Sequence, residues 1–105
     1  IKTGRISRPM IGFLGQDITS ANADALNLDF SEGVIVTVIS KSGPAYQSGV
    51  RAGDVLTKID GIPIADVEEW LKLLWSYDVG SNVDIELFRN GEIINTTVQL
   101  GEREP

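Results

Sequence analysis

Few residues in this chain could carry out chemistry, and they restrict the kinds of catalysis open to it. The 105 residues contain no His and no Cys, so neither a Ser-His-Asp nor a Cys-His nucleophile system can be assembled. Ser40, Lys41 and Ser42 are adjacent, which leaves Lys-assisted serine chemistry as a formal option. Neighbours in a strand-to-turn segment do not by that fact face one pocket, so a solvated turn is the simpler interpretation.

Acid–base or metal chemistry would need carboxylates at suitable spacing. Asp54 and Asp60 are the two that turns should hold rigidly, but hydrogen bonds from an Asp side chain to nearby backbone explain both positions. The spacing of Asp17, Asp24 and Asp29 is not that of a calcium loop. We therefore expect this segment to have no catalytic residues, no metal site and no cofactor.

Composition excludes further classes of function. Nine Lys and Arg stand among fifteen Asp and Glu, giving a formal charge of −6 without a basic stripe for nucleic acid or a membrane surface. The longest nearly uncharged apolar runs are about eight residues, far short of the ~20 of a membrane span. With 42% apolar residues, the chain can bury one core and is expected to form one domain.

The elements in the first half of the chain follow from glycine positions and apolar patterns. Residues 10–18 are expected to form a strand interrupted by Gly12 and Gly15. Thr19 or Ser20 can cap a short, weak helix over residues 21–28. Residues 34–39 are β-branched and apolar on both faces, which predicts a buried central strand.

The second half of the chain predicts a helix followed by a hairpin. Asp66 is a good N-cap for a helix over residues 66–77, whose apolar stripe consists of Val67, Trp70, Leu71 and Leu74. Asn90-Gly91 is a strong two-residue hairpin signal between strands over residues 83–87 and 93–100. Val98 and Leu100 are expected on one face of the return strand.

Residues 42–61 place four backbone constraints within twenty positions. Gly43-Pro44 opens a turn and a short helix, Gly49 and Gly53 can take positive φ, and Asp60-Gly61 ends an alternating strand. This succession resembles the signature of PDZ domains. The resemblance implies an α+β fold, a partly open β-barrel of five to six strands with two helices. Because the strand after Asn90-Gly91 closes the sheet, the order resembles the permuted type found in bacterial proteases.

The segment Arg8-Pro9-Met10-Ile11-Gly12-Phe13 is similar to the PDZ loop whose backbone N–H groups bind the C-terminal carboxylate of a peptide. By itself it also fits a core strand with a bulge glycine. Residues 1–13 resemble the junction between protease and PDZ domain in HtrA (Deg) trypsin-like serine proteases, with Arg-Pro before the loop. The implied organisation is a linker at 1–8, a PDZ domain at 9–101 and a tail at 102–105.

The resemblance implies that a peptide adds as a strand beside residues 12–18, opposite the helix over residues 66–77. Leu71 would form the pocket wall and Leu74 its floor, which favours an apolar C-terminal residue. Trp75 would extend the apolar surface or form a core or interdomain contact, and Glu68 would meet residues further back in the peptide. The residues implied are Met10, Ile11, Gly12 and Phe13 for the carboxylate, and Leu14, Gly15, Gln16, Glu68, Leu71, Leu74 and Trp75 for the groove and pocket.

The function that the resemblance implies is recognition of C-terminal or unfolded-protein peptides for an HtrA-like serine endopeptidase in protein quality control and stress response. Its own protease domain would be a second partner, and the parent would be extracytoplasmic and trimeric or larger. Two alternatives stay open: a mainly assembly or regulatory contact, and a PDZ module of an intramembrane metalloprotease or a C-terminal processing protease.

Overall fold

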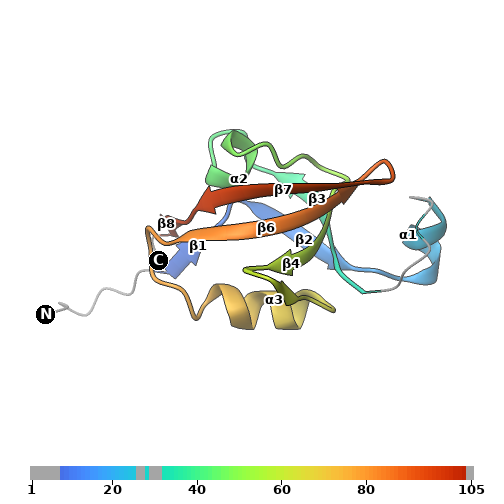
Figure 1. Cartoon of the computed structure of the whole chain (residues 1–105), viewed down its shortest axis with the longest axis horizontal. Coiled ribbons are helices and arrows are strands. Elements are labelled where there is room, and N and C mark those ends of the chain that lie inside the picture. Colours follow the sequence, from blue (N-terminus) through green and yellow to red (C-terminus); the bar gives the residue numbers. More distant parts are fainter. Residues whose placement is uncertain (1–7, 26–27, 29–31, 104–105) are drawn as a thin grey trace, which may run out of the picture.

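The computed structural model of the chain describes residues 8–25, 28 and 32–103. Three helices are interspersed among eight strands in this part of the chain (Figure 1). The elements are β1 (Arg8–Met10), β2 (Phe13–Asp17), α1 (Ser20–Ala25), β3 (Val34–Ile39), α2 (Pro44–Gln47), β4 (Val55–Ile59), β5 (Ile62–Pro63), α3 (Val67–Leu74), β6 (Asn82–Arg89), β7 (Glu92–Gln99) and β8 (Gly101–Arg103).

One antiparallel sheet organises the domain, with the strand order β2-β3-β4-β6-β7 and β5 attached to β4. Two tight turns shape it as predicted: Asn90 (φ 50°) and Gly91 (φ 81°) join β6 to β7, and Asp60 (φ 49°) and Gly61 (φ 79°) join β4 to β5. Both residues of each turn have positive φ, as the favoured two-residue hairpins require. The α+β fold is confirmed, with β2 and β7 as the two edges of the sheet.

The core lies between the sheet and α3, which runs along one side of the domain in Figure 1. Both residues predicted to share a face at the end of the return strand, Val98 and Leu100, are buried. Three helices are present in the described residues, because the short helix expected after Gly43-Pro44 forms as α2 in addition to the two helices of the implied fold. The fully buried side chains include Ile11, Val34, Val36, Val50, Leu56, Ile59, Ile85 and Leu87.

Only the first half of strand β3 is buried, although its apolar composition predicted burial along its whole length. Val34, Ile35 and Val36 are buried, whereas Val38 is 59% exposed. The cause is its pairing: β4 covers β3 only at Val34 and Ile35, so the second half of β3 has a strand partner on the β2 side alone. The apolar residues on both faces of residues 34–39 therefore correctly predict a central strand. They do not predict that the end of this strand is exposed.

The helix predicted over residues 66–77 is shorter. It begins after Asp66, whose side chain accepts a hydrogen bond from the Glu69 N–H as an N-cap, and it ends at Leu74. The Ser76 and Tyr77 N–H groups bond three residues back, to Leu73 and Leu74, so the last turn tightens and leaves the α-helical pattern. The helix α1 spans Ser20–Ala25, and its Thr19 cap accepts from the Asn22 N–H. Residues 26–27 of the predicted helix lie outside the described part.

The strands β1 and β8 form a separate antiparallel pair, in which Pro9 lies opposite Glu102 and Met10 opposite Gly101. This pairing draws Arg8 and residues 102–103 into the fold, beyond the 9–101 range expected from sequence. Residues 1–7 and 104–105 of the expected linker and tail lie outside the described part. The chain therefore approaches and leaves the domain at one place (Figure 1).

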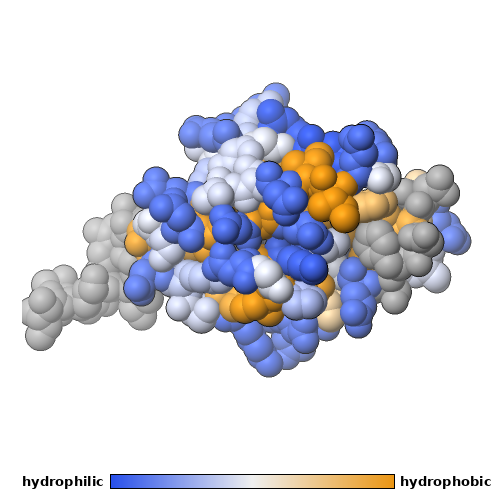
Figure 2. Space-filling view, viewed as in Figure 1, coloured by the Kyte–Doolittle hydropathy of each residue, from blue (hydrophilic) through white to orange (hydrophobic). Residues whose placement is uncertain are grey.

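No helix in residues 8–25 or 32–103 is long and apolar enough to cross a membrane. On the face shown in Figure 2, apolar side chains form separate small groups among hydrophilic ones. The larger apolar side chains that remain exposed include Leu14, Val38, Ile62, Trp75 and Ile93.

An ion pair between a buried carboxylate and a partly exposed arginine holds the turn between α2 and β4. The Asp54 side chain is buried, and Arg89 Nε and Nη2 donate to its two carboxylate oxygens, each at 2.7 Å. Asp54 also accepts from the Arg51 N–H, and Arg89 donates to the Gly49 carbonyl. The hydrogen bonds that Arg89 donates to Asp54 raise the pKa of Arg89 above its usual value. The local turn bond was expected from sequence; the partner on β6 was not.

We expect Asp54→Ala to destabilise the domain strongly, because it leaves Arg89 without its partner and removes the acceptor for the Arg51 N–H. Losing hydrogen bonds to a charged group costs about 1.5–3 kcal/mol in the free energy of unfolding. Urea unfolding measures it, with Asp24→Ala on the exposed surface of α1 as the control. Equal, small losses in both variants would contradict this role for Asp54.

Candidate functional site

A mostly apolar cavity of about 350 Å³ lies between β2 and α3. Two elements from distant parts of the sequence form its sides, and the loop over residues 10–13, called the 10–13 loop from here on, forms one end. Its lining consists of Pro9, Met10, Ile11, Gly12, Phe13, Leu14, Val38, Ile39, Ser40, Trp70, Leu71 and Leu74. A hollow of this size and character suits a single apolar side chain with neighbouring backbone.

The base of the cavity is fixed by an aromatic pair. The Phe13 and Trp70 rings stack with their centroids 5.5 Å apart and an angle of 10° between their planes. Trp70 and Leu74 are buried, whereas Leu71 is only half-buried and remains available at the cavity wall. The helix stripe predicted from sequence therefore serves two purposes: Trp70 and Leu74 belong to the core and also line the hollow, and Leu71 adds a partly exposed wall.

Gly12 allows the 10–13 loop to turn against the start of α2. Its φ is +97°, and a Cβ there would lie 3.2 Å from Gly43 Cα and 3.3 Å from Pro44 Cδ. Both adjoining carbonyls are used: the Ile11 carbonyl accepts from the Ala45 N–H and the Gly12 carbonyl from the Ser40 N–H. The loop is thus held by close contact and by hydrogen bonds on its carbonyl side.

The N–H side of the same loop is different. Within residues 8–25, 28 and 32–103, neither Ile11 nor Gly12 donates its backbone N–H to a protein acceptor. Since the neighbouring carbonyls point towards Ser40 and Ala45, the two donors are left for another acceptor. Consecutive backbone N–H groups in a sharp turn form a concave site for an anion.

The strand β2 offers an open edge next to this loop. In the described residues it pairs only with β3. The Gly12 carbonyl and the Leu14 carbonyl face β3, where they accept from the Ser40 N–H and the Thr37 hydroxyl. Backbone groups of alternate residues point in opposite directions along a strand, so the N–H and C=O groups of Phe13 and Gly15 face the open edge.

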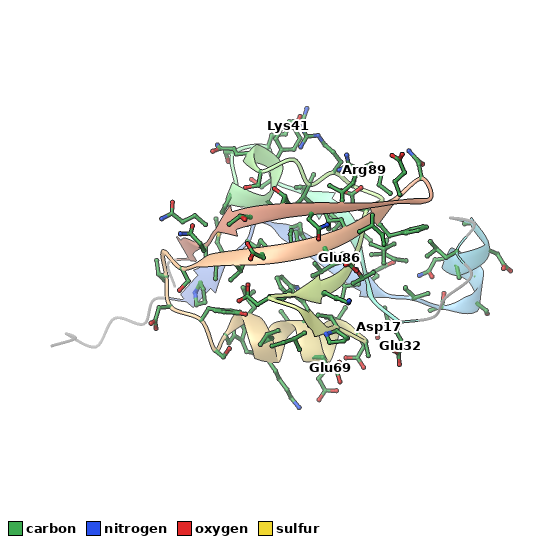
Figure 3. All side chains as sticks on the ribbon, viewed as in Figure 1. Asp17, Glu32, Lys41, Glu69, Glu86 and Arg89 are labelled. Atoms are coloured by element: carbon green, nitrogen blue, oxygen red, sulfur yellow. The ribbon has the colours of Figure 1, made fainter. Side chains whose placement is uncertain are left out.

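Three carboxylates position the start of α3. The Val67 N–H donates to Asp17 Oδ1 at 2.7 Å, the Glu69 N–H donates to Asp66, and the Ala65 N–H donates to Glu69 Oε1. Negative groups at a helix N-terminus satisfy its free N–H groups and complement its dipole. Asp17 and Glu69 are labelled beside this end of the helix in Figure 3. Because Asp17 belongs to β2, its bond joins the two sides of the cavity directly.

The other end of α3 is held through Tyr77. Its hydroxyl donates to Asp60 Oδ2 at 2.6 Å, while Asp60 Oδ1 accepts from the Asp84 N–H. Burial and the hydrogen bond to Asp60 together raise the pKa of Tyr77 from 10.0 to about 12. Both ends of α3 are therefore fixed to the sheet, one through Asp17 and one through Asp60.

The residues predicted for the site separate into two groups. Met10, Ile11, Gly12, Phe13, Leu14, Leu71 and Leu74 line the cavity together. Gly15 and Gln16 continue along β2 beyond the cavity, Glu68 is exposed and pairs with Lys72 at 3.4 Å, and Trp75 lies outside the lining with 54% of its surface exposed.

Sequence reasoning missed Trp70 as part of the site, together with Val38, Ile39 and Ser40 from the end of β3. Trp70 was within the predicted stripe but was not named as a site residue. The β3 residues gave no local signal, because their place depends on the register in which Phe13 lies opposite Ile39.

The residues considered for catalysis have structural partners. The Ser40 and Ser42 hydroxyls hydrogen-bond to each other at 3.2 Å, and Asp54 and Asp60 are bound to Arg89 and Tyr77. Within the described ranges, no group of three or more His, Cys, Asp or Glu side chains is arranged to hold a metal ion.

The comparison with family models decides the family. The model described as "PDZ domain" matches residues 12–100. The chain belongs to the PDZ domain family. This match covers β2, α3 and the cavity lining from Gly12 onward, and it begins at the glycine of the 10–13 loop.

Curated relatives of this PDZ domain are HtrA and DegP serine proteases. It is 31% identical to the serine protease Do-like HtrA of Lactobacillus helveticus, covering 95% of this chain and 25% of the relative. It is 28% identical to the periplasmic serine endoprotease DegP of Escherichia coli K12, and the match covers 95% of this chain and 21% of DegP. The chain thus spans about a quarter of the length of these relatives.

Solved structures agree with this assignment. The HtrA-type protease AlgW with a decapeptide superimposes with a TM-score of 0.90 at 28% identity, covering 98% of this chain and 32% of that chain. The HtrA3 PDZ domain bound to the phage-derived ligand FGRWV gives 0.83 at 21% identity, covering 95% and 91%, and supports the fold. Both of these structures contain a peptide.

We expect Gly12→Ala to distort the 10–13 loop, because it combines a positive φ with a contact against backbone atoms of Gly43. The matched control is Gly91→Ala, which also has positive φ but has open space around the added Cβ. Strain at positive φ should cost each variant about 1–2 kcal/mol of unfolding free energy. Only Gly12→Ala should change the backbone amide NMR signals of Ile11, Phe13 and Ala45; similar spectra for both variants would contradict the loop assignment.

The Tyr77–Asp60 bond predicts a loss of stability in alkali. Because the folded-state pKa of Tyr77 is raised, its stabilisation is complete below about pH 10 and is lost as the pH rises from 10 towards 12. Urea unfolding across this range should show a smaller decrease for Tyr77→Phe than for the wild type. Identical pH profiles would show that the phenol does not stabilise the end of α3.

Proposed function

We propose that this domain binds the C-terminal end of a polypeptide by strand addition to β2. The terminal carboxylate accepts hydrogen bonds from the N–H groups of Ile11, Gly12 and Phe13, and the last side chain enters the β2–α3 cavity. The observation that carries the proposal is the pair of unused N–H donors at Ile11 and Gly12, which lie next to an apolar cavity and to an open strand edge.

The chemistry of each part supports a different portion of the ligand. An open strand edge gives main-chain hydrogen bonds that do not depend on peptide sequence, while a cavity beside it selects a side chain. The lining by Phe13, Trp70, Leu71 and Leu74 favours an apolar final residue. In the peptide-bound neighbours, the ligands are a decapeptide, a tripeptide and the pentapeptide FGRWV.

The parent protein is part of the same proposal. The similarity to HtrA and DegP over 95% of this chain supports a serine endopeptidase that uses the domain to recognise or regulate access of unfolded substrates. By the same similarity we place the parent outside the cytoplasm, as an oligomer that acts in protein quality control. The protease domain upstream would supply the catalytic residues that this segment lacks.

A second candidate function is a regulatory contact with the parent's own protease domain. The feature that favours it is the β1–β8 pair, since β1 leads directly into the 10–13 loop and Met10 lies opposite Gly101. A ligand bound at the loop would therefore affect the position of β1, the strand through which the chain enters the domain. Protease activity of the full-length protein with and without this domain, each measured with and without peptide, separates the two functions.

The carboxylate claim predicts that peptides with a free C-terminus bind more tightly than the same peptides amidated. Hydrogen bonds to a charged group are worth about 1.5–3 kcal/mol, which corresponds to roughly ten- to hundredfold in affinity. Calorimetric titration of both forms of a peptide ending in Val measures the difference. Equal affinities would overturn the role of the Ile11 and Gly12 N–H groups.

The cavity claim predicts that Leu71→Ala weakens peptide binding about tenfold or more, since a buried contact with the final side chain is lost. Leu73→Ala is the matched control on the same helix, because Leu73 lines a separate hollow with Ile62 and Pro63. Both variants should fold, and only the first should lose affinity. Equal effects on binding would place the ligand elsewhere on α3.

A further inference from the structure

The side chain of Asp17 crosses from the end of β2 to the start of α3. Its Oδ1 accepts the Val67 N–H at 2.7 Å, so the strand edge and the helix are joined by one short bond. Asp17 is the last of the five residues of β2, and Val67 is the first of α3. This bond lies at the opposite end of the strand from the 10–13 loop.

The cavity between β2 and α3 ends before it reaches the Asp17–Val67 hydrogen bond. Its lining includes Phe13 and Leu14 from β2 and Trp70, Leu71 and Leu74 from α3. Neither Gly15, Gln16 and Asp17 on the strand nor Val67 and Glu68 on the helix contribute to it. The hollow is thus bounded by the loop and does not extend to the Asp17–Val67 bond.

An added strand needs room that this bond removes. Neighbouring strands lie about 4.8 Å apart, so a peptide on β2 requires that spacing plus room for its own backbone before α3 begins. At Asp17, one short side chain and a 2.7 Å hydrogen bond span the whole gap between the strand and the helix. The five residues of β2 minus Asp17 leave four, Phe13 to Gln16, for pairing with a peptide.

We infer that Asp17 sets the length of the peptide that the groove accepts, which is the last four residues of a chain. Residues further back leave the domain at Gln16 and make no strand contacts. This inference rests on the proposed strand addition, and it makes Asp17 a residue that determines specificity by length rather than by sequence.

The helix does not depend on Asp17 for its start. Asp66 still caps the Glu69 N–H, Glu69 still accepts from the Ala65 N–H, and the Ala65 carbonyl still accepts from the Gly33 N–H at 3.0 Å. Replacement of Asp17 should therefore open the end of the groove without unfolding α3. Asp17→Asn is the matched control, because its amide oxygen keeps an acceptor at the same position.

The experiment is a titration with N-acetylated peptides of three, four, six and eight residues that end in Val and have Ser and Ala upstream. For the wild type and Asp17→Asn, affinity should rise up to four residues and then change by less than about twofold. For Asp17→Ala, affinity should continue to rise about fivefold or more from four to eight residues, because further strand hydrogen bonds become available. Hydrogen exchange without peptide should show faster exchange of the Val67 amide in Asp17→Ala than in Asp17→Asn.

Three results would overturn the inference. In the first, the affinity of the wild type increases beyond a peptide length of four residues, as that of Asp17→Ala does. In the second, the affinity of neither protein increases beyond four residues. In the third, the Val67 amide exchanges at the same rate in all variants. Failure of the proposed function is distinguishable, since it would appear as no binding of any peptide at any length, with the difference in Val67 exchange preserved.

Discussion

The distance between the edge of β2 and helix α3 is the constraint on which the site depends. It is fixed at one end by the hydrogen bond from Val67 to Asp17 and nearer the loop by the stack of Phe13 on Trp70. The helix is additionally tied to the sheet through Tyr77 and Asp60. A cavity between two elements that are fixed in this way is pre-formed, so a ligand does not need to meet the cost of ordering it.

The scaffold around the site serves the same constraint. The Asp54–Arg89 pair fixes the turn after α2, and the first turn of α2 supplies the Ala45 N–H that holds the Ile11 carbonyl. Gly12 then approaches Gly43 and leaves its N–H directed away from these contacts. The segment over residues 42–61 therefore supports the loop from behind. Its Ala45 N–H occupies the Ile11 carbonyl, whereas the Gly12 carbonyl accepts from Ser40, which precedes the segment.

Features that depend on local sequence were predictable, and those that depend on register were not. The two hairpin turns at Asp60-Gly61 and Asn90-Gly91 and the Asp66 cap were expected, because the residues themselves determine those conformations. The Arg89 partner of Asp54, 35 residues away, and the pairing of β1 with β8 have no local signal. Likewise, the exposed end of β3 and the stacking of Trp70 on Phe13 depend on how distant elements align.

The central claim is that a peptide carboxylate binds the N–H groups of the 10–13 loop while its backbone extends β2. The most direct test is a crystal structure of the domain with a bound peptide of four residues that has a free C-terminus. We predict carboxylate oxygens within hydrogen-bond distance of the Ile11 and Gly12 nitrogens, and peptide backbone bonded to Phe13 and Gly15. A peptide seated on the β7 edge, or on the hollow lined by Ile62 and Leu73, would contradict the account.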